Sequence, residues 1–226
     1  MASDPRPWHH RYVTALTDRS HQLRAILVGD EPAAWDDAGF TVVDSALRVG
    51  TTIVVLDPDL PSGIARADID GLDGDVDGLP IGPIETPAGL PHGHRNRVHG
   101  FDHLVAMSPS IQRTSTMLID AGLELRRTRT FPAGDQTRRQ DFFWLGDVIL
   151  ELVGVEDATS NEPASLWGLA LECDNLDAAV VELADGIGPA KNAVQAGRRI
   201  ATIRTRELGV SVPIALMSPH PRRDNG

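Results

Sequence analysis

His103 and Glu151 are the two residues of this sequence whose types and surroundings best suit chemistry. His103 lies in FDHLVAM (101–107), and Glu151 lies in VILELV (148–153). Both segments predict strands, in which alternate side chains face one side, so each polar residue shares its face with apolar neighbours. A carboxylate in an apolar row is costly unless a cation, a hydrogen-bond donor or a proton neutralises it. We therefore expect Glu151 to meet a metal ion, an arginine or its own proton.

Three interpretations of this pair stay open at the level of the sequence. An imidazole nitrogen and a carboxylate oxygen are ordinary ligands for a divalent ion such as Zn, Ni, Mn or Fe. A buried carboxylate with a raised pKa near a histidine is also a usual arrangement for proton transfer. The third interpretation is a structural histidine beside a glutamate that faces an arginine or solvent. Glu172 is a further candidate near the same group.

Two other motifs carry weaker signals. The histidines of PHGHRNRVHGFDH (91–103) have the spacing H-x-H-x4-H-x3-H, which matches no closed metal site, and this segment predicts a loop. The segment DGDVDG (73–78) copies the first half of a calcium-binding loop. Its twelfth position is Ile84 rather than a glutamate, and Pro80 and Pro83 interrupt it. The sequence therefore favours neither site.

The elements that must position these residues follow from apolar runs and their punctuation. The connection over 57–97 is rich in Pro, Gly and Asp, and we expect at most one strand there, around 64–69. Other strands are predicted over 25–28, 40–43, 51–56, 101–107, 123–130, 140–144, 148–153, 166–172, 200–206 and 210–217. Helices, each after a polar cap, are predicted over 30–39, 109–121 and 175–185.

A recurring order of elements organises the chain. DAGF (37–40), DAGL (120–123) and ADGI (184–187) each follow an apolar strand, a polar cap and an amphipathic helix, and each precedes further strands. The first copy is truncated. The predicted organisation is an N-terminal arm (1–22), a partial module with an acidic loop (23–96), and two complete modules (97–157 and 165–219).

The two complete modules resemble the vicinal-oxygen-chelate superfamily of glyoxalases, bleomycin-resistance proteins and extradiol dioxygenases. HGFDHLVAMSPSIQRTSTMLIDAGLEL and RRQDFFWLGDVILELVG carry the resemblance in the first module. In the second, it is carried by SLWGLALECDNLDAAVVELADGIG, AVQAGRRIATIR and LGVSVPIALMSP. The resemblance implies an α+β fold in which paired βαβββ modules form a cupped mixed sheet, preceded by the truncated module.

The resemblance also implies where a metal would bind. In that superfamily the ligands lie on the first and last strands of each module, and His103 and Glu151 match these positions in the first module. The matching positions of the second module, at 167–169 and near Ala215, hold no ligand. A tight zinc site needs three or four protein ligands, and an iron dioxygenase site needs two histidines and a carboxylate. One divalent ion and no cofactor at all are therefore equally compatible with this incomplete set.

Arginines and tryptophans are candidates for holding a ligand rather than reacting with it. Arginines on strands that line a cup would bind a carboxylate, phosphate or enolate through paired N–H donors. A solvated basic face is the alternative for the arginines, and core packing is the alternative for the tryptophans. The predicted substrate-binding residues are Arg139, Trp144, Trp167, Arg198 and Arg204.

Together these features predict a glyoxalase-like enzyme of isomerase, epimerase or lyase type, acting on a small oxygenated or anionic metabolite. His103 would be a metal ligand or general base, and Glu151 a ligand or acid/base. The alternative is a metal-free protein that binds and sequesters a small molecule, as bleomycin-resistance proteins do. A third interpretation is a structural or regulatory module whose cup is filled.

Composition limits the partners and the location. The 226 residues carry a formal net charge of −11, which repels phosphate backbones and anionic membranes, so we expect no nucleic-acid or membrane partner. The N-terminus shows no apolar signal core, and the lone Cys173 fits a reducing cytoplasm, where we place the protein. We also predict a homodimer in which the partial module covers an exposed sheet edge, although docking within the chain would satisfy the same edge.

Overall fold

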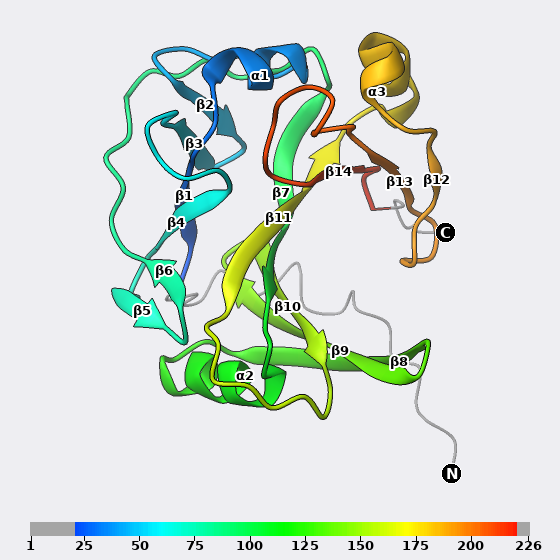
Figure 1. Ribbon diagram of the computed structural model, residues 1–226. Coiled ribbons are helices and arrows are strands. Elements are labelled where there is room, and N and C mark those ends of the chain that lie inside the picture. The colour runs from blue at the N-terminus through cyan, green and yellow to red at the C-terminus, as the bar shows by residue number, and fades with distance from the viewer. Residues whose placement is uncertain (1–20, 221–226) are drawn as a thin grey trace, which may run out of the picture.

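Two β-sheets build the part of the chain that the computed structural model describes, residues 21–220 (Figure 1). The N-terminal sheet has the order β2-β3-β1-β4-β6-β5, and the C-terminal sheet has the order β12-β13-β14-β11-β7-β10-β9-β8. The strands are β1 (Leu23–Val28), β2 (Ala46–Val49), β3 (Thr52–Leu56), β4 (Ile64–Ile69), β5 (Gly74–Val76), β6 (Leu79–Ile81), β7 (Val98–Met107), β8 (Leu125–Ala133), β9 (Gln136–Leu145), β10 (Val148–Val155), β11 (Ser165–Cys173), β12 (Lys191–Asn192), β13 (Arg199–Thr202) and β14 (Ile214–Met217). The α-helices are α1 (Pro32–Asp37), α2 (Ile111–Asp120) and α3 (Leu176–Leu183), and a short 3-10 helix, η1 (Ala184–Gly186), follows α3.

The C-terminal sheet consists of two modules with the same strand order. In the first, β7 is followed by α2 and then β8, β9 and β10, and β10 returns parallel to β7. In the second, β11 is followed by α3 and then β12, β13 and β14, and β14 returns parallel to β11. A parallel return requires a crossover connection, which the helix of each module provides. The two first strands, β7 and β11, pair antiparallel in the middle of the sheet, so the predicted α+β fold of paired βαβββ modules is confirmed.

The three helices lie where the recurring pattern predicts them. Glycines follow α1 and α2 at Gly39 and Gly122, with φ angles of 85° and 100° that a side chain would strain. The α3 helix begins at an Asn175 cap, whose side chain accepts a hydrogen bond from the Ala178 amide at 3.0 Å. Glycines therefore mark the ends of α1 and α2, and a side-chain cap marks the start of α3.

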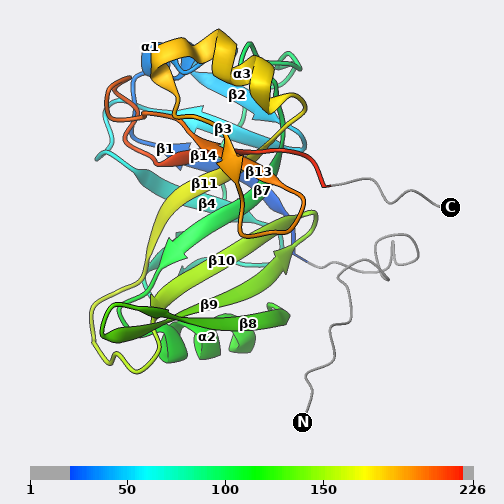
Figure 2. The ribbon, with the colours of Figure 1, turned by 90° about the vertical axis from the view of Figure 1, so that its right-hand side faces the viewer.

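The C-terminal sheet is curved, and its two faces differ in character (Figures 1 and 2). The N-terminal sheet covers the back of β7 and β11, and α2 and α3 lie against the two ends of the same convex face. Apolar side chains that point to this covered face form the core, among them Leu104, Phe143, Leu150, Leu152 and Leu171. The opposite, concave face of the sheet is here called the cup.

One predicted strand of the N-terminal half is wrong. Residues 40–43 form no strand, and the hairpin strand is β2 instead. Asp44 and Ser45 adopt left-handed φ angles of 49° and 56°, so the chain turns back at once and Val43 makes only an isolated bridge to Ala46. The run at 40–43 is apolar, as a strand would be, but the turn at Asp44 and Ser45 follows so closely that no regular strand forms before it.

The connection over 57–97 also departs from the prediction, because it holds three strands rather than one. The predicted strand around 64–69 is β4, and β5 and β6 form a hairpin that adds to it. Asp77 and Gly78 make the hairpin turn, with φ angles of 56° and 90°. Asp-Gly is favoured in such two-residue turns because both positions need positive φ. The residues of the calcium-like motif DGDVDG therefore serve to form the turn between β5 and β6.

The N-terminal sheet repeats the plan of the C-terminal sheet on a smaller scale. Its middle strands, β1 and β4, pair antiparallel, as β7 and β11 do. Each has a parallel neighbour from its own half, β3 beside β1 and β6 beside β4. The sequence predicted one truncated module, and the structure contains two truncated halves.

The N-terminal sheet docks within the chain. Asp77 accepts hydrogen bonds from Arg113, at 2.7 Å, and from Thr114 of α2, which joins the β5–β6 hairpin to the first module. Of the two outcomes expected for this segment, intrachain docking is the one observed, while the homodimer stays a prediction that light scattering would test. Among the described residues, no helix is long and apolar enough to cross a membrane.

Candidate active site

His103 and Glu151 lie on the same face of the C-terminal sheet. Residues that pair directly across neighbouring strands share a face, and His103 pairs with Ile149 while Glu151 pairs with Val105. The intervening Leu104 and Leu150 point into the core, so His103 and Glu151 point into the cup. The structure therefore brings these two side chains together on one side of adjacent parallel strands.

A β-bulge places Asp102 beside His103. On β11, Ala170 pairs with His103 and Leu171 pairs with Phe101, which leaves Asp102 as an extra residue on β7. A bulge re-aims the side chain of the extra residue, and Asp102 turns toward the cup instead of the core. Its Oδ2 lies 2.5 Å from His103 Nδ1. At this distance the carboxylate and the imidazole interact strongly, and the contact favours the ionised form of Asp102.

Arg198 is the cation that faces Asp102. The next residue, Arg199, pairs with Asp177 of α3 on the convex side, so alternation directs Arg198 into the cup. Its Nη1 donates to Asp102 Oδ1 at 2.7 Å and to Gln195 Oε1 at 2.6 Å. Its Nε donates to the Ser218 carbonyl at 2.7 Å. Arg198 is only 2% exposed, so this is a buried ion pair held in place by further hydrogen bonds.

These contacts fix the charge of Asp102. Burial opposes ionisation of this carboxyl, but the contacts with His103 and Arg198 outweigh it and lower the pKa of Asp102 to about 2. Glu172 lies 3.5 Å from Arg198 Nη2, and burial together with the neighbouring Asp102 charge raises the pKa of Glu172. At neutral pH, Asp102 is therefore the ionised partner of Arg198.

Glu151 is the carboxyl whose protonation is favoured. Burial raises the pKa of Glu151, the nearby His103 and Arg129 oppose the shift, and the Asp102 charge adds to it. One hydrogen bond orients the group, because Gln140 Nε2 donates to Glu151 Oε1. Asp102 and Glu151 thus differ in environment: one carboxyl is held as an anion, and the other retains its proton to higher pH.

The cup holds all three buried side-chain atoms that lack a hydrogen-bond partner within the described range 21–220. They are Asp102 Oδ2, Gln140 Oε1 and Arg198 Nη2. Native proteins leave few buried polar atoms unsatisfied, and each exception calls for a reason. Two of them have an oppositely charged neighbour all the same, since Asp102 Oδ2 lies 2.5 Å from His103 Nδ1 and Arg198 Nη2 lies 3.5 Å from Glu172 Oε1. Of these three atoms within 21–220, only Gln140 Oε1 has neither a hydrogen bond nor an ion pair, so it is the acceptor left for a bound molecule.

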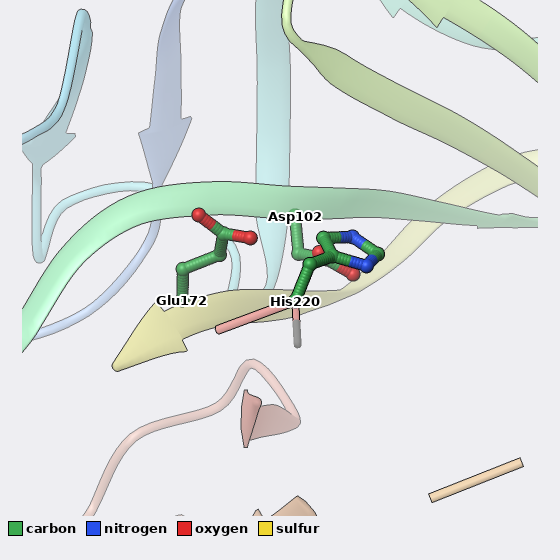
Figure 3. A group of neighbouring side chains, drawn as sticks. All are labelled: Asp102, Glu172 and His220. Carbon is green, nitrogen blue, oxygen red and sulfur yellow. The ribbon is translucent and has the colours of Figure 1, made fainter. Parts of the chain in front are cut away.

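Asp102, Glu172 and His220 form a second arrangement in the cup, drawn in Figure 3. Each offers one potential ligand atom, and these atoms lie within 4.8 Å of one another, which is a spacing that could hold a metal ion. They come from β7, from β11 and from the segment after β14, and their side chains point toward one another (Figure 3).

The guanidinium of Arg198 already contacts all three of these groups. Its Nη1 lies 2.7 Å from Asp102 Oδ1 and 3.3 Å from His220 Nε2, and its Nη2 lies 3.5 Å from Glu172 Oε1. A divalent ion between these ligands would meet a buried positive charge at contact distance. This donor set therefore does not fit a metal while Arg198 keeps its position, and His103 with Glu151 adds only two ligands.

The predicted substrate-binding residues divide between the two faces. Trp144 pairs with Ile149, which places it in the cup, and the Arg126 guanidinium lies 5.9 Å from its ring centre. Trp167 is the extra residue of a bulge in β11, between Leu166 and Gly168, and its ring is half exposed.

Two of the predicted arginines do not face the cup. Arg139 contacts Asp141 at 2.8 Å and Gln112 of α2 at 2.7 Å, because its neighbour Gln140 takes the cup side of β9. Arg139 therefore lies on the α2 side of the sheet, and its role in binding a substrate stays a prediction. Arg204 lies in the turn after β13, 3.9 Å from Glu207. Arg198 does face the cup, but as the buried partner of Asp102.

Sequence reasoning missed Asp102, Gln140, Arg129 and His220 as members of this group. Gln140 and Arg129 could have been found, because regular alternation along β9 and β8 puts both side chains on the same face of the sheet as Glu151. Asp102 could not, because alternation alone directs it away from His103 and no local signal announces the bulge.

Comparisons with known proteins agree with the fold. No family model matches the chain, and no curated protein matches it by sequence. Among solved structures, a mutant of 4-hydroxymandelate synthase from Streptomyces coelicolor is 15% identical with a TM-score of 0.58, covering 92% of this chain and 95% of that one. A xylose isomerase-like TIM barrel/4-hydroxyphenylpyruvate dioxygenase fusion protein is 11% identical with a TM-score of 0.56, covering 91% of this chain and 49% of that one.

A smaller solved protein matches only one part of the chain. Methylmalonyl-CoA epimerase from Mycobacterium tuberculosis is 22% identical with a TM-score of 0.43, covering 55% of this chain and 91% of that one. The near-full-length match to 4-hydroxymandelate synthase agrees with the α+β fold of paired βαβββ modules that the motifs predict.

Proposed function

We propose that this protein is an enzyme that moves a proton on the carbon next to a carbonyl group of a small anionic metabolite, in the manner of an isomerase or epimerase. One observation carries the proposal: a histidine backed by an ionised aspartate and a carboxyl with a raised pKa point into the same cup from adjacent strands. Groups with opposed proton affinities on one face are the usual sign of an acid–base pair.

His103 is the proposed base. Its Nδ1 faces the Asp102 carboxylate, which stabilises the positive charge that the ring gains on taking a proton. Nε2 is then the nitrogen that removes the proton from carbon. Phe142 meets the imidazole edge-on, with 6.2 Å between ring centres, and keeps its orientation. Arg198 supports the base indirectly by holding Asp102 ionised.

Glu151 is the proposed acid. Its raised pKa favours the protonated carboxyl, the form that would donate to the substrate carbonyl oxygen as the C–H bond breaks. The electron pair of that bond then moves into an enol, so no free enolate charge has to be buried. In an isomerase, His103 then gives the proton to the former carbonyl carbon, while Glu151 recovers a proton from the neighbouring hydroxyl group as that group becomes the new carbonyl, so both residues regain their starting states.

Arg129 supports the choice of an anionic substrate. It pairs with Gln140 and so faces the cup, where its charge acts on Glu151. Its guanidinium lies 5.1 Å from the Phe131 ring centre and is bound to no carboxylate among the described residues. A carboxylate or phosphate of the substrate would give it a partner, and Trp144 offers a flat apolar surface nearby.

A metal-free binding protein is the second candidate. It is favoured because Asp102, Glu172 and His220 fit a divalent ion poorly. A protein that holds no metal could not carry out a reaction that depends on one, but it could still bind a small molecule. The same cup, with its unsatisfied polar atoms, would hold an oxygenated ligand without changing it.

Hydrogen exchange at carbon separates the two candidates. The protein would be incubated in D2O with a panel of 2-oxo acids and hydroxy ketones, and loss of the C–H signal would be followed by proton NMR. An enzyme exchanges at least one class of compound faster than buffer does. We expect His103→Gln and Glu151→Gln to slow this exchange by roughly 10²–10⁴-fold.

Glu85→Gln is the matched control, because Glu85 is an exposed carboxylate outside the cup and loses the same charge. Saturable binding without any exchange would overturn the enzyme and support sequestration. Exchange that survives both substitutions would show that the reaction takes place elsewhere.

A further inference from the structure

A basic cleft lies at the junction of the two sheets, outside the set of residues assigned to the cup. Its volume is about 250 Å³, and its charged lining comes from Arg48, His92, Arg97, His99 and Asp174. These residues belong to β2, to the segment that leads into β7, to β7 itself and to the residue after β11. The N-terminal sheet and both C-terminal modules therefore contribute to one cleft.

The two arginines of the cleft have no partner among the residues that the structure describes. Neither Arg48 nor Arg97 makes a side-chain hydrogen bond or ion pair that involves any residue of the range 21–220. The acidic lining residue contacts a histidine of the same cleft, since Asp174 Oδ1 lies 3.0 Å from His99 Nε2. With two guanidinium groups and one carboxylate, the cleft is a local reversal of charge in a chain with a net charge of −11.

The cleft wall at His94 is fixed by the backbone. Its Nδ1 accepts from the Thr41 amide at 3.0 Å, so its Nε2 carries the proton and donates to the Arg48 carbonyl at 3.0 Å. Burial lowers the pKa of His94, which agrees with a neutral ring. Both ring nitrogens are therefore used, and His94 links the segment before β7 to β2.

Arg97 is presented by a strained but well-anchored backbone. Its φ of 62° is left-handed, an uncommon conformation for a residue with a side chain. The preceding Asn96 enforces it, because its buried side chain donates to the Ala38 carbonyl at 3.0 Å and accepts from the Val98 amide. Strain of this kind persists where the surroundings over-determine it, often at ligand sites.

We propose that this cleft binds the phosphoryl group of a small phosphorylated molecule. Arg48 and Arg97 supply paired N–H donors for its oxygens, and the imidazoles of His92 and His99 line the same space. A dianion with three terminal oxygens uses this donor set better than a single carboxylate. The volume suits a phosphoryl group and a short attached fragment rather than a large ligand.

The same geometry decides against a metal at the histidine-rich segment. His94 has no free nitrogen, and the two arginines repel a cation at the remaining histidines. The spacing of histidines in 91–103 is therefore explained by one structural ring and an anion cleft.

Titration calorimetry with inorganic phosphate at constant ionic strength tests the site. We expect one saturable site in the wild type, with Arg48→Gln and Arg97→Gly each weakening it at least tenfold. Glycine at position 97 keeps the left-handed backbone while removing the charge. The control is Arg206→Gln, an exposed arginine outside the cleft, which should bind phosphate as the wild type does.

Acetate at the same ionic strength distinguishes a phosphoryl site from a carboxylate site. Equal affinity for acetate and phosphate would overturn the choice of ligand. Binding that is absent, or that is unchanged in both Arg48→Gln and Arg97→Gly with their folds intact by circular dichroism, would overturn the site. Neither outcome bears on proton transfer in the cup, because His103 and Glu151 are not altered.

Discussion

His103 and Glu151 face the same side of two neighbouring parallel strands, displaced by one pair on that face, since His103 is opposite Ile149 and Val105 is opposite Glu151. The relationship depends on α2, which carries the chain across so that β10 can return parallel to β7. His103 meets the carboxylate of Asp102, its own neighbour on β7, whereas Glu151 meets Gln140 of β9. The acid–base hypothesis therefore predicts measurable consequences for stability as well as for activity.

The free energy of unfolding of Glu151→Gln, relative to that of the wild type, should increase as pH rises. The pKa of Glu151 is raised above its ordinary value of 4.5, so the folded state favours the protonated carboxyl. The associated stability is fully present below the unfolded pKa and is lost as pH rises through the folded pKa. Glutamine imitates the protonated form at every pH. Its advantage over the wild type at pH 8 should be about 1.4 kcal/mol for each unit of the shift.

Urea unfolding of wild type and Glu151→Gln at pH 4 and pH 8 measures this difference. The exposed Glu85→Gln serves as the control and should show no such change with pH. A Glu151→Gln variant that loses stability relative to the wild type between pH 4 and pH 8 would mean that the carboxylate is held as an anion, and Glu151 could not be the acid.

Asp102 and Arg198 should behave as one unit in a double-mutant cycle. Removing one partner of a buried pair leaves an uncompensated group, so Asp102→Asn or Arg198→Gln alone should each cost about 3–5 kcal/mol in the free energy of unfolding at pH 7. The double variant should cost much less than the sum, because no buried charge is left unpaired. Additive losses would show that the 2.7 Å contact contributes no coupling.

The Asp102–Arg198 pair also predicts how the free energy of unfolding falls at acid pH. The pKa of Asp102 is lowered from 3.8 to about 2, so its contribution is present above the unfolded pKa and is lost as pH falls through the folded value. A shift of that size corresponds to about 2 kcal/mol. The gap between wild type and Asp102→Asn should therefore narrow by that amount between pH 5 and pH 2, as measured by urea unfolding.

The cup shows how far alternation along a strand can go as a predictor. Period-two patterning placed His103 and Glu151 on their faces correctly, because both lie in regular stretches of β7 and β10. It failed at Asp102, where an extra residue shifts the register, and a bulge depends on how two strands far apart in the sequence meet. Arg139 was assigned to the cup by residue type alone, and its neighbour Gln140 occupies that side.

The N-terminal half shows a different limit. Apolar runs located β1 and β3, but residues 40–43 were assigned to a strand although the turn at Asp44 and Ser45 uses two left-handed residues that carry side chains. Such residues are uncommon at these angles, so the sequence gives little warning of the turn. The two small strands β5 and β6 are only three residues each and gain their pairing from β4, which local propensity does not report.

Removing the Arg198 guanidinium should convert the cup into a divalent metal site. Asp102, Glu172 and His220 have the spacing of a ligand set, and Arg198 contacts each of them. With glutamine at position 198, the two carboxyl groups lose their counter-ion, and a cation of charge +2 becomes the favourable replacement. Calorimetry with Zn²⁺ or Ni²⁺ should show at least tenfold tighter binding to Arg198→Gln than to the wild type.

Arg199→Gln is the matched control for this gain, because Arg199 is the adjacent arginine and pairs with Asp177 on the opposite face. Adding His220→Ala to Arg198→Gln should abolish the gain, which would tie the ion to the predicted ligands. Tight stoichiometric metal binding by the wild type, lost on His103→Gln or Glu151→Gln, would contradict the argument. The ion would then belong to the first and last strands of the first module, and Arg198 would be a bystander rather than the resident cation.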